Sequence, residues 1–116
     1  MALDPMYGGS TAFIDADSNG GTDIALVAAK TAHHIVLDYI LITASAAASA
    51  FIESDGSVSD TVIFPTVYLA AGDNVQIDNP CVRSLVGEAL VFNATVTGNI
   101  SCFVRYHYEP GAGAYA

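Results

Sequence analysis

Hydrophobic and polar side chains alternate with a period of two along residues 90–96 and 100–108, two neighbouring stretches near the end of the chain. This period is typical of β-strands with one buried face and does not fit an amphipathic helix. A three-residue loop at 97–99 predicts a β-hairpin that keeps the apolar residues together on one face. The predicted pairs are Val96 with Ile100, Ala94 with Cys102, Phe92 with Val104, and Leu90 with Tyr106. Phe103 then lies among polar neighbours on the opposite face, where an aromatic residue is a candidate partner contact.

Six further strands are predicted between turn signals rich in Gly, Pro, Asn and Asp. They span residues 23–28, 31–44, 50–53, 61–70, 75–77 and 82–86. Residues 31–44 are almost continuously apolar, which indicates a strand covered on both faces or lying at a subunit contact. Pro65 interrupts residues 61–70 and favours a position at the edge of a sheet.

Short strands at spacings of about ten residues, without a convincing helix, predict an all-β protein. An eight-stranded jelly-roll-like β-sandwich with an extended N-terminal arm suits a chain of this size. An immunoglobulin-like sandwich is the alternative, disfavoured because the chain has no Trp and no cysteine pair placed on facing strands. The predicted organisation is an arm with an Asp- and Gly-rich loop at 1–22, the sandwich at 23–109, and a small-residue tail at 110–116.

Composition and charge restrict the partners of such a sandwich. The 116 residues suffice for one domain with one core. No apolar run approaches the ~20 residues that span a bilayer, and no secretory signal is visible, so we expect synthesis in the cytoplasm. Three Lys and Arg residues against twelve Asp and Glu give a formal charge of −9. Three scattered cations cannot form a basic stripe, so nucleic acid and anionic membranes are not expected partners.

One segment resembles the front of a calcium-binding loop, with Gly20 at its sixth position. Residues with oxygen ligands stand at the first, third, fifth and ninth positions, which are Asp15, Asp17, Asn19 and Asp23. The twelfth position, where a bidentate Glu would complete the coordination, is Leu26. Because the same residue types also form ordinary surface turns, a calcium site and a plain loop are both open interpretations.

The sequence predicts no catalytic site and no other cofactor. His33 and His34 are adjacent, so on a strand they face opposite ways and cannot chelate one ion together. His107 lacks the neighbouring ligands of a cupin-type metal site. No Ser-centred nucleophile motif and no phosphate-binding loop is present. Cys81 and Cys102 are expected to be free thiols. We therefore expect a non-enzymatic protein.

Several short motifs carry a resemblance to a known family: ILITA at 40–44, AFIESDG at 50–56, YLAAGDNV at 68–75, GEAL at 87–90, TVTG at 95–98 and VRY at 104–106. With these motifs, residues 35–109 resemble the small jelly-roll structural proteins of tailed bacteriophage virions. The resemblance implies a capsid decoration or cement protein, a homotrimer that binds the major capsid protein on the capsid surface. The alternative within the same particles is a tail or fibre module that recognises a host glycan or protein.

A protein that binds a partner without catalysing a reaction needs contact residues at its surface. Aromatic residues and Met are enriched in the cores of protein interfaces. The candidates lie in the arm, on the outer face of the last strand and near the C-terminus. They are Met6, Tyr7, Phe103, Tyr108 and Tyr115.

Overall fold

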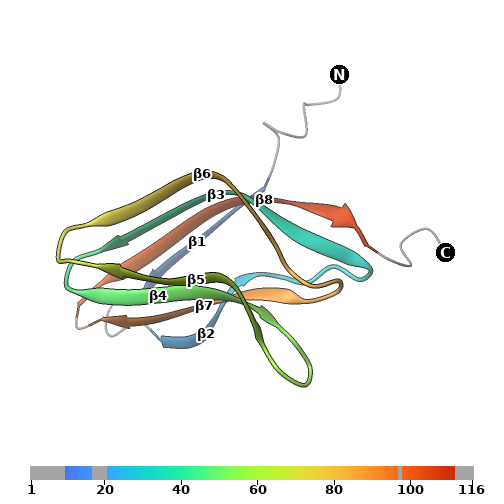
Figure 1. Cartoon of the computed structure of the whole chain (residues 1–116), viewed down its shortest axis with the longest axis horizontal. Coiled ribbons are helices and arrows are strands. Elements are labelled where there is room, and N and C mark those ends of the chain that lie inside the picture. The colour runs from blue at the N-terminus through green and yellow to red at the C-terminus, as the bar shows by residue number, and fades with distance from the viewer. Residues whose placement is uncertain (1–9, 17–20, 97, 112–116) are drawn as a thin grey trace.

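The computed structural model describes residues 10–16, 21–96 and 98–111, which form two antiparallel sheets of four strands each (Figure 1). The first sheet has the order β1 (Ser10–Ala16), β8 (Ile100–Pro110), β3 (His33–Ala44) and β6 (Asn74–Arg83). The second sheet has the order β2 (Gly21–Val27), β7 (Ala89–Val96), β4 (Ala48–Asp55) and β5 (Thr61–Leu69). The predicted all-β class is confirmed. Among the described residues there is no helix long and apolar enough to cross a membrane.

The core fills the space between the two sheets. β4 alternates buried and partly exposed residues along its length, as a strand with one inward face must. Its inward residues are Ala48, Ala50, Ile52 and Ser54. Branched and aromatic side chains from both sheets complete the core, among them Ile35, Ile40, Ile42, Leu90, Phe92, Ile100 and Val104. Removing this apolar surface from water is the main force that holds the sheets together.

The hairpin predicted for residues 90–108 is wrong in its pairing. β7 pairs with β2 and β4, whereas β8 pairs with β1 and β3, so the two strands lie in different sheets. The predicted pairs Val96–Ile100, Ala94–Cys102, Phe92–Val104 and Leu90–Tyr106 therefore do not form. The predicted inward face is confirmed, because these side chains pack into one core from opposite sheets.

The connection that carries the chain from β7 to β8 is hydrogen-bonded to the turn between β3 and β4. Ser45 N donates to Asn99 O at 2.9 Å, and Asn99 N donates to Ser45 Oγ at 2.8 Å. The loop thus steps across from one sheet to the other. Alternation identifies the buried face of each strand, but it does not identify the neighbouring strand.

The inward face of β3 changes side partway along the strand. The register shifts between Leu37 and Tyr39 in the pairings with both β6 and β8, so Asp38 is a bulge. Inward residues are odd-numbered before the bulge and even-numbered after it: Ile35, Leu37, Ile40 and Ile42. The apolar run at 31–44 therefore combines two inward half-faces and does not require a strand covered on both sides.

The edge strands β5 and β6 differ from the prediction in continuity. β5 runs through Pro65, and its predicted edge position is confirmed because it ends the order of the second sheet. Residues 75–77 and 82–86 were expected to form separate strands, but β6 is one edge strand through Pro80. Asn79 and Cys81 have φ of 58° and 60°, a local distortion that an edge strand tolerates.

β1 lies within the predicted arm and was not anticipated as a strand. It pairs with β8, with Ser10 opposite Tyr106 and Ala16 opposite Ile100. Residues 1–9 of the arm and 112–116 of the tail lie outside the described residues. Three connections, 28–32, 56–60 and 84–88, lie toward the same end of the sandwich (Figure 1).

Candidate functional site

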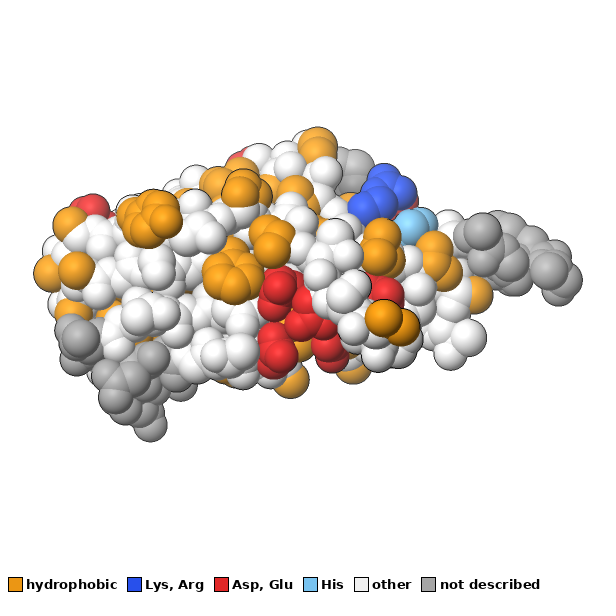
Figure 2. Space-filling view, turned by 60° about the horizontal axis from the view of Figure 1, so that its bottom comes forward, with side chains coloured by type: hydrophobic (Ala, Val, Ile, Leu, Met, Phe, Trp, Pro, Cys, Tyr) orange, Lys and Arg blue, Asp and Glu red, His pale blue; other side chains and the backbone are white. Residues whose placement is uncertain are grey.

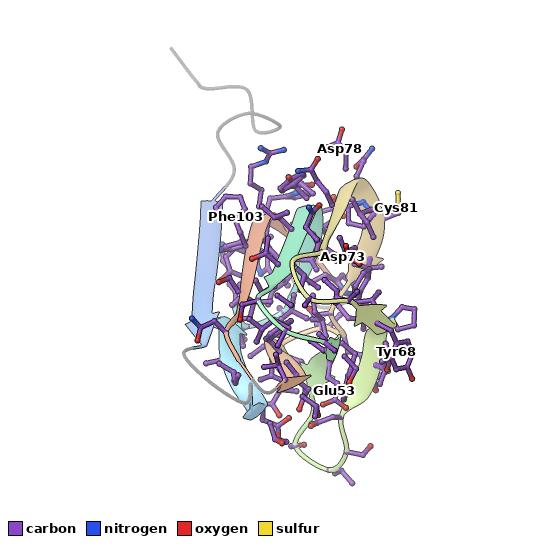
Figure 3. The ribbon with its side chains drawn as sticks, turned by 90° about the vertical axis from the view of Figure 1, so that its left-hand side faces the viewer. Glu53, Tyr68, Asp73, Asp78, Cys81 and Phe103 are labelled. Carbon is purple, nitrogen blue, oxygen red and sulfur yellow. The ribbon has the colours of Figure 1, made fainter. Side chains whose placement is uncertain are left out.

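Three carboxylates gather at one place on the second sheet. Asp23 of β2, Glu53 of β4 and Asp60, just before β5, each offer an oxygen, and these oxygens lie within 4.8 Å of one another. Figure 2 shows a cluster of acidic side chains on this face, and Figure 3 labels Glu53. The pairing of Glu53 with Val62 brings the start of β5, and hence Asp60, beside β4.

A buried amide positions two of these carboxylates. Asn93 of β7 is only 4% exposed. Its Nδ2 donates to Glu53 Oε1 and its Oδ1 accepts from Asp23 N, both at 2.9 Å. The pairing of β2 with β7 is irregular between Gly21 and Ile24, and Asp23 has φ of 52°. The Asn93 side chain thus accepts the hydrogen bond of a backbone amide in the irregular part of β2.

A second hydrogen-bond network joins the cluster to the loop at 84–88. Ser54 is fully buried; its Oγ donates to Glu88 Oε1 at 2.6 Å and accepts from Leu85 N at 2.9 Å. Asp55 follows Ser54, and its carboxyl group interacts with that of Asp60. Five carboxylates, those of Asp23, Glu53, Asp55, Asp60 and Glu88, are therefore brought to this end of the sandwich.

The carboxylates repel one another. Partial desolvation and the charges of Asp60 and Asp23 raise the pKa of Glu53, although the hydrogen bond from Asn93 opposes them. Partial desolvation and the hydrogen bond with Asp60 raise the pKa of Asp55 in the same direction. Both shifts express first the cost of desolvating a carboxylate and then the cost of holding several negative charges together.

The cations of the chain are engaged elsewhere. Lys30 Nζ lies 5.4 Å from the centre of the Tyr108 ring. Arg83 Nη2 lies 3.7 Å from Glu109 Oε1. The Arg105 guanidinium lies 4.6 Å from the centre of the Tyr39 ring. These are all the Lys and Arg residues of the sequence, so in the described part of the chain no Lys or Arg is placed against the acidic cluster by these contacts.

The oxygens of Asp23, Glu53 and Asp60 are ligands of the kind that calcium takes. Exposed acidic groups also gather without an ion, so the cluster alone assigns no metal. The sequence leaves the segment 15–23 open between a calcium site and a plain loop; of its candidate ligands, Asp15 lies in β1 opposite Ser101, whereas Asp17 and Asn19 lie outside the described residues. Only Asp23 of these candidates enters the cluster in the described part of the chain.

Glu53 and Asp60 were missed by the sequence analysis. The turn signal at 54–57 connects β4 and β5, and it could have placed these two residues side by side. Asp23 joins them only because β7 lies between β2 and β4, a strand order that no local pattern reveals.

The candidate interface residues have different surroundings. Phe103 lies on the outer face of the first sheet, with its ring centre 6.1 Å from that of Tyr39 (Figure 3). Tyr108 packs against the core, and its hydroxyl donates to Ala28 O at 2.7 Å. Tyr108 therefore anchors the loop between β2 and β3. Three candidates lie outside the described residues: Met6, Tyr7 and Tyr115.

A shallow depression of about 170 Å³ lies on the outer face of the second sheet beside the acidic cluster. Phe51 is its aromatic wall, and most of its other side chains are uncharged and polar. They include Thr22, Ser49, Asn93 and Thr95.

The histidines and cysteines do not converge on one site. His33 Nδ1 contacts Thr31 O at 2.8 Å, and His34 Nδ1 contacts Ser84 O at 2.7 Å. Cys81 is exposed on β6, while Cys102 is buried in the core; neither forms a disulfide. Burial raises the pKa of the Cys102 thiol to about 12, so this thiol is unreactive at neutral pH.

Comparison with known proteins adds no relative: no protein-family model matches the chain, and no curated protein matches its sequence. The class that the fold defines is an antiparallel two-sheet β protein. Its function must be inferred from the arrangement of strands and from the surface.

Proposed function

We propose that the protein is a jelly roll and a non-enzymatic structural component of a bacteriophage virion, of the capsid decoration type. The observation that carries the proposal is the strand order β1-β8-β3-β6 over β2-β7-β4-β5. Two Greek keys folded together produce this order, in which consecutive strands alternate between the sheets except at β4–β5. The order supports the resemblance to virion proteins independently of the short sequence motifs. A fold alone does not determine a function, so the surface must be considered as well.

Large apolar side chains on the described surface support a role in binding. Five of them are exposed: Val58, Val62, Tyr68, Leu85 and Val86. In the proposed mechanism, three copies of the chain associate and bind the major capsid protein at the outer surface of the shell. Several weak contacts made at once raise the apparent affinity by roughly 10²- to 10⁴-fold, and this avidity braces the shell.

The oligomeric part of the proposal is tested by light scattering on the purified chain. A trimer has three times the 12.0 kDa mass of one chain. The capsid part is tested by adding the protein to shells that lack it and imaging them by electron microscopy. Saturable density at symmetry-related positions on the shell is expected, and unbound shells at saturating protein would overturn the proposal.

Deletion of residues 1–9 then tests the contacts proposed for Met6 and Tyr7 in the arm. Normal decoration by the shortened chain would exclude these contacts.

A recognition module of a phage tail or fibre is the second candidate function. The depression beside Phe51 favours it, because an aromatic ring with neighbouring hydroxyl groups suits a sugar ring. Location distinguishes the two candidates: a few copies at the tail support recognition, and many symmetric copies on the shell support decoration. A Phe51→Ala variant with lower affinity for an immobilised host glycan would support recognition.

A further inference from the structure

Exposed apolar side chains surround the acidic cluster. Val58 in the loop at 56–60 is 97% exposed, and Val62 at the start of β5 is 51% exposed. Leu85 and Val86 are exposed in the loop at 84–88. Figure 2 shows apolar side chains beside the acidic ones on this face. We name this surface the acid–apolar end; it consists of Val58, Val62, Leu85 and Val86 with Asp23, Glu53, Asp55, Asp60 and Glu88.

Hydrogen bonds and strand pairing make the acid–apolar end one continuous surface. Val62 stands opposite Glu53 across the β4–β5 pairing. Leu85 is tied to β4 by the bond from its backbone amide to Ser54 Oγ, and Glu88 accepts a bond from the same hydroxyl. The loop at 84–88 is therefore held against the end of β4, and strand pairing fixes Val62 beside it. A surface fixed in this way lowers the entropy lost when a partner binds.

The negative charge of this surface is not neutralised by the Lys and Arg residues of the chain. Lys30, Arg83 and Arg105 have aromatic or acidic neighbours outside the acid–apolar end. Desolvation and like charges make full ionisation of Glu53 and Asp55 costly. Cations supplied from outside would remove the repulsion, and burial of the exposed valines and Leu85 would add a favourable apolar term.

We propose that the acid–apolar end is a docking surface for a protein that presents Lys or Arg side chains among apolar ones. Charge complementarity selects this partner. A nucleic acid or an anionic membrane would be repelled by the carboxylates, and a bare metal ion would leave Val58, Val62 and Leu85 in water. Identifying this partner with the capsid protein rests on the proposed function, whereas the docking chemistry does not.

The first test is an NMR titration of the full chain with a synthetic peptide that alternates Arg and Leu. Chemical-shift changes are expected at residues 54–62 and 84–88. Two control peptides separate the contributions: one replaces Arg by Glu, and the other replaces Leu by Ser. The Glu peptide should not bind, and the Ser peptide should bind about tenfold more weakly than the Arg–Leu peptide. Added salt should weaken the binding of both Arg peptides.

Variants of the protein test the same surface by changing its own residues, with the Arg–Leu peptide kept constant. The triple variant Asp55→Asn, Asp60→Asn, Glu88→Gln should bind the Arg–Leu peptide roughly tenfold more weakly. It keeps a hydrogen-bond acceptor at each position, and thermal unfolding checks that it folds. The pair Val62→Thr and Leu85→Ser should also weaken binding. Asp78→Asn is the matched control: Asp78 is an exposed carboxylate on β6, far from Glu53 in Figure 3, and its loss should change nothing.

Unchanged binding by the folded triple variant would overturn the proposal, as would shift changes spread evenly over all acidic residues. Equal binding of the Ser and Arg–Leu peptides would also overturn it, because the apolar part would then contribute nothing.

An experiment with capsid shells distinguishes this docking proposal from the proposed virion role. Shells decorated equally by the wild-type chain and the triple variant would exclude the acid–apolar end as the capsid contact while leaving decoration intact. Shells that bind neither would refute decoration, and the peptide result would still decide on docking.

Discussion

His107 is held between two carboxylates on the outer face of the first sheet. Its Nδ1 contacts Asp38 Oδ2 and its Nε2 contacts Glu109 Oε2, both at 2.8 Å. Partial burial disfavours the charged ring, but the two carboxylates outweigh it and raise the pKa of His107 above its ordinary value of 6.5. The hydrogen bond with His107 in turn lowers the pKa of Glu109 below its ordinary value of 4.5. This His107 bridge joins β3 to β8, and Arg83 of β6 lies beside it.

The stability that the bridge contributes should depend on pH. The raised pKa of His107 means that its contribution is complete below pH 6.5 and is lost as the pH rises through the folded-state value. The lowered pKa of Glu109 means that its contribution is present above pH 4.5 and is lost on acidification. His107→Gln should therefore lower the free energy of unfolding by about 0.5–1 kcal/mol near pH 5.5, since the groups are partly exposed. The difference should shrink as the pH rises through the raised folded-state pKa of His107.

Urea unfolding of both chains at several pH values measures this difference. His33→Gln is the control, because the His33 ring contacts the nearby backbone carbonyl of Thr31 through Nδ1 and has no carboxylate in that contact. A difference that stays constant from acid to alkaline pH would show that His107 acts through packing.

Asn93 is the residue on which the acidic cluster depends most. Asn93→Ala leaves Asp23 N without its acceptor and Glu53 Oε1 without its donor. We expect a loss of about 1–3 kcal/mol in the free energy of unfolding, measured by urea denaturation. Thr95→Ala on the same strand is the control, since Thr95 is exposed. A loss no larger than that of the control would mean that water replaces both bonds.

At the scale of the elements, local patterns predicted which face of each strand is buried better than which strands are neighbours. Burial follows from alternation within one strand, and β4 and β8 obey it. Strand order depends on residues far apart in the chain, so the partners of β7 and β8 were assigned wrongly. The same limit applied to the site: Asp23 was singled out for a local calcium loop, although its neighbours Glu53 and Asp60 come from β4 and the start of β5.

The crossing of the β7–β8 loop over the β3–β4 turn can be tested at Gly98. A methyl group at this position would lie 2.6 Å from Ser45 Oγ and 3.2 Å from Ala46 Cβ. Gly98→Ala should therefore cost about 1–3 kcal/mol of stability through steric conflict. The cost should be smaller in a Ser45→Ala background, where the nearest atom is removed. A thermodynamic cycle of thermal unfolding for the four chains measures the coupling, and strict additivity would contradict the crossing geometry.

At the scale of the whole molecule, the two sheets share one core and should unfold together. Ile42 of the first sheet and Ile52 of the second are both fully buried. Ile42→Val and Ile52→Val should each cost about 0.5–1.5 kcal/mol. Hydrogen exchange should show equal loss of protection in β3 and β4 in either variant. Val58→Thr, at an exposed position, should have almost no effect. Loss of protection confined to the sheet that carries the substitution would instead indicate two independent units.

The positions of β7 and β8 have a consequence for synthesis. β8 lies between β1 and β3, and β7 lies between β2 and β4, so the last two of these eight strands to be synthesised are interior strands, one in each sheet. Until they emerge, β3–β6 and β4–β5 are the pairs of neighbouring strands that can form, while β1, β2, β3 and β4 each border the empty position of an interior strand. A chain that lacks β7 and β8 therefore cannot form a smaller version of the same fold, because β1, β2, β3 and β4 each lack a neighbouring strand. Neither sheet can be completed before β7 and β8 have been synthesised.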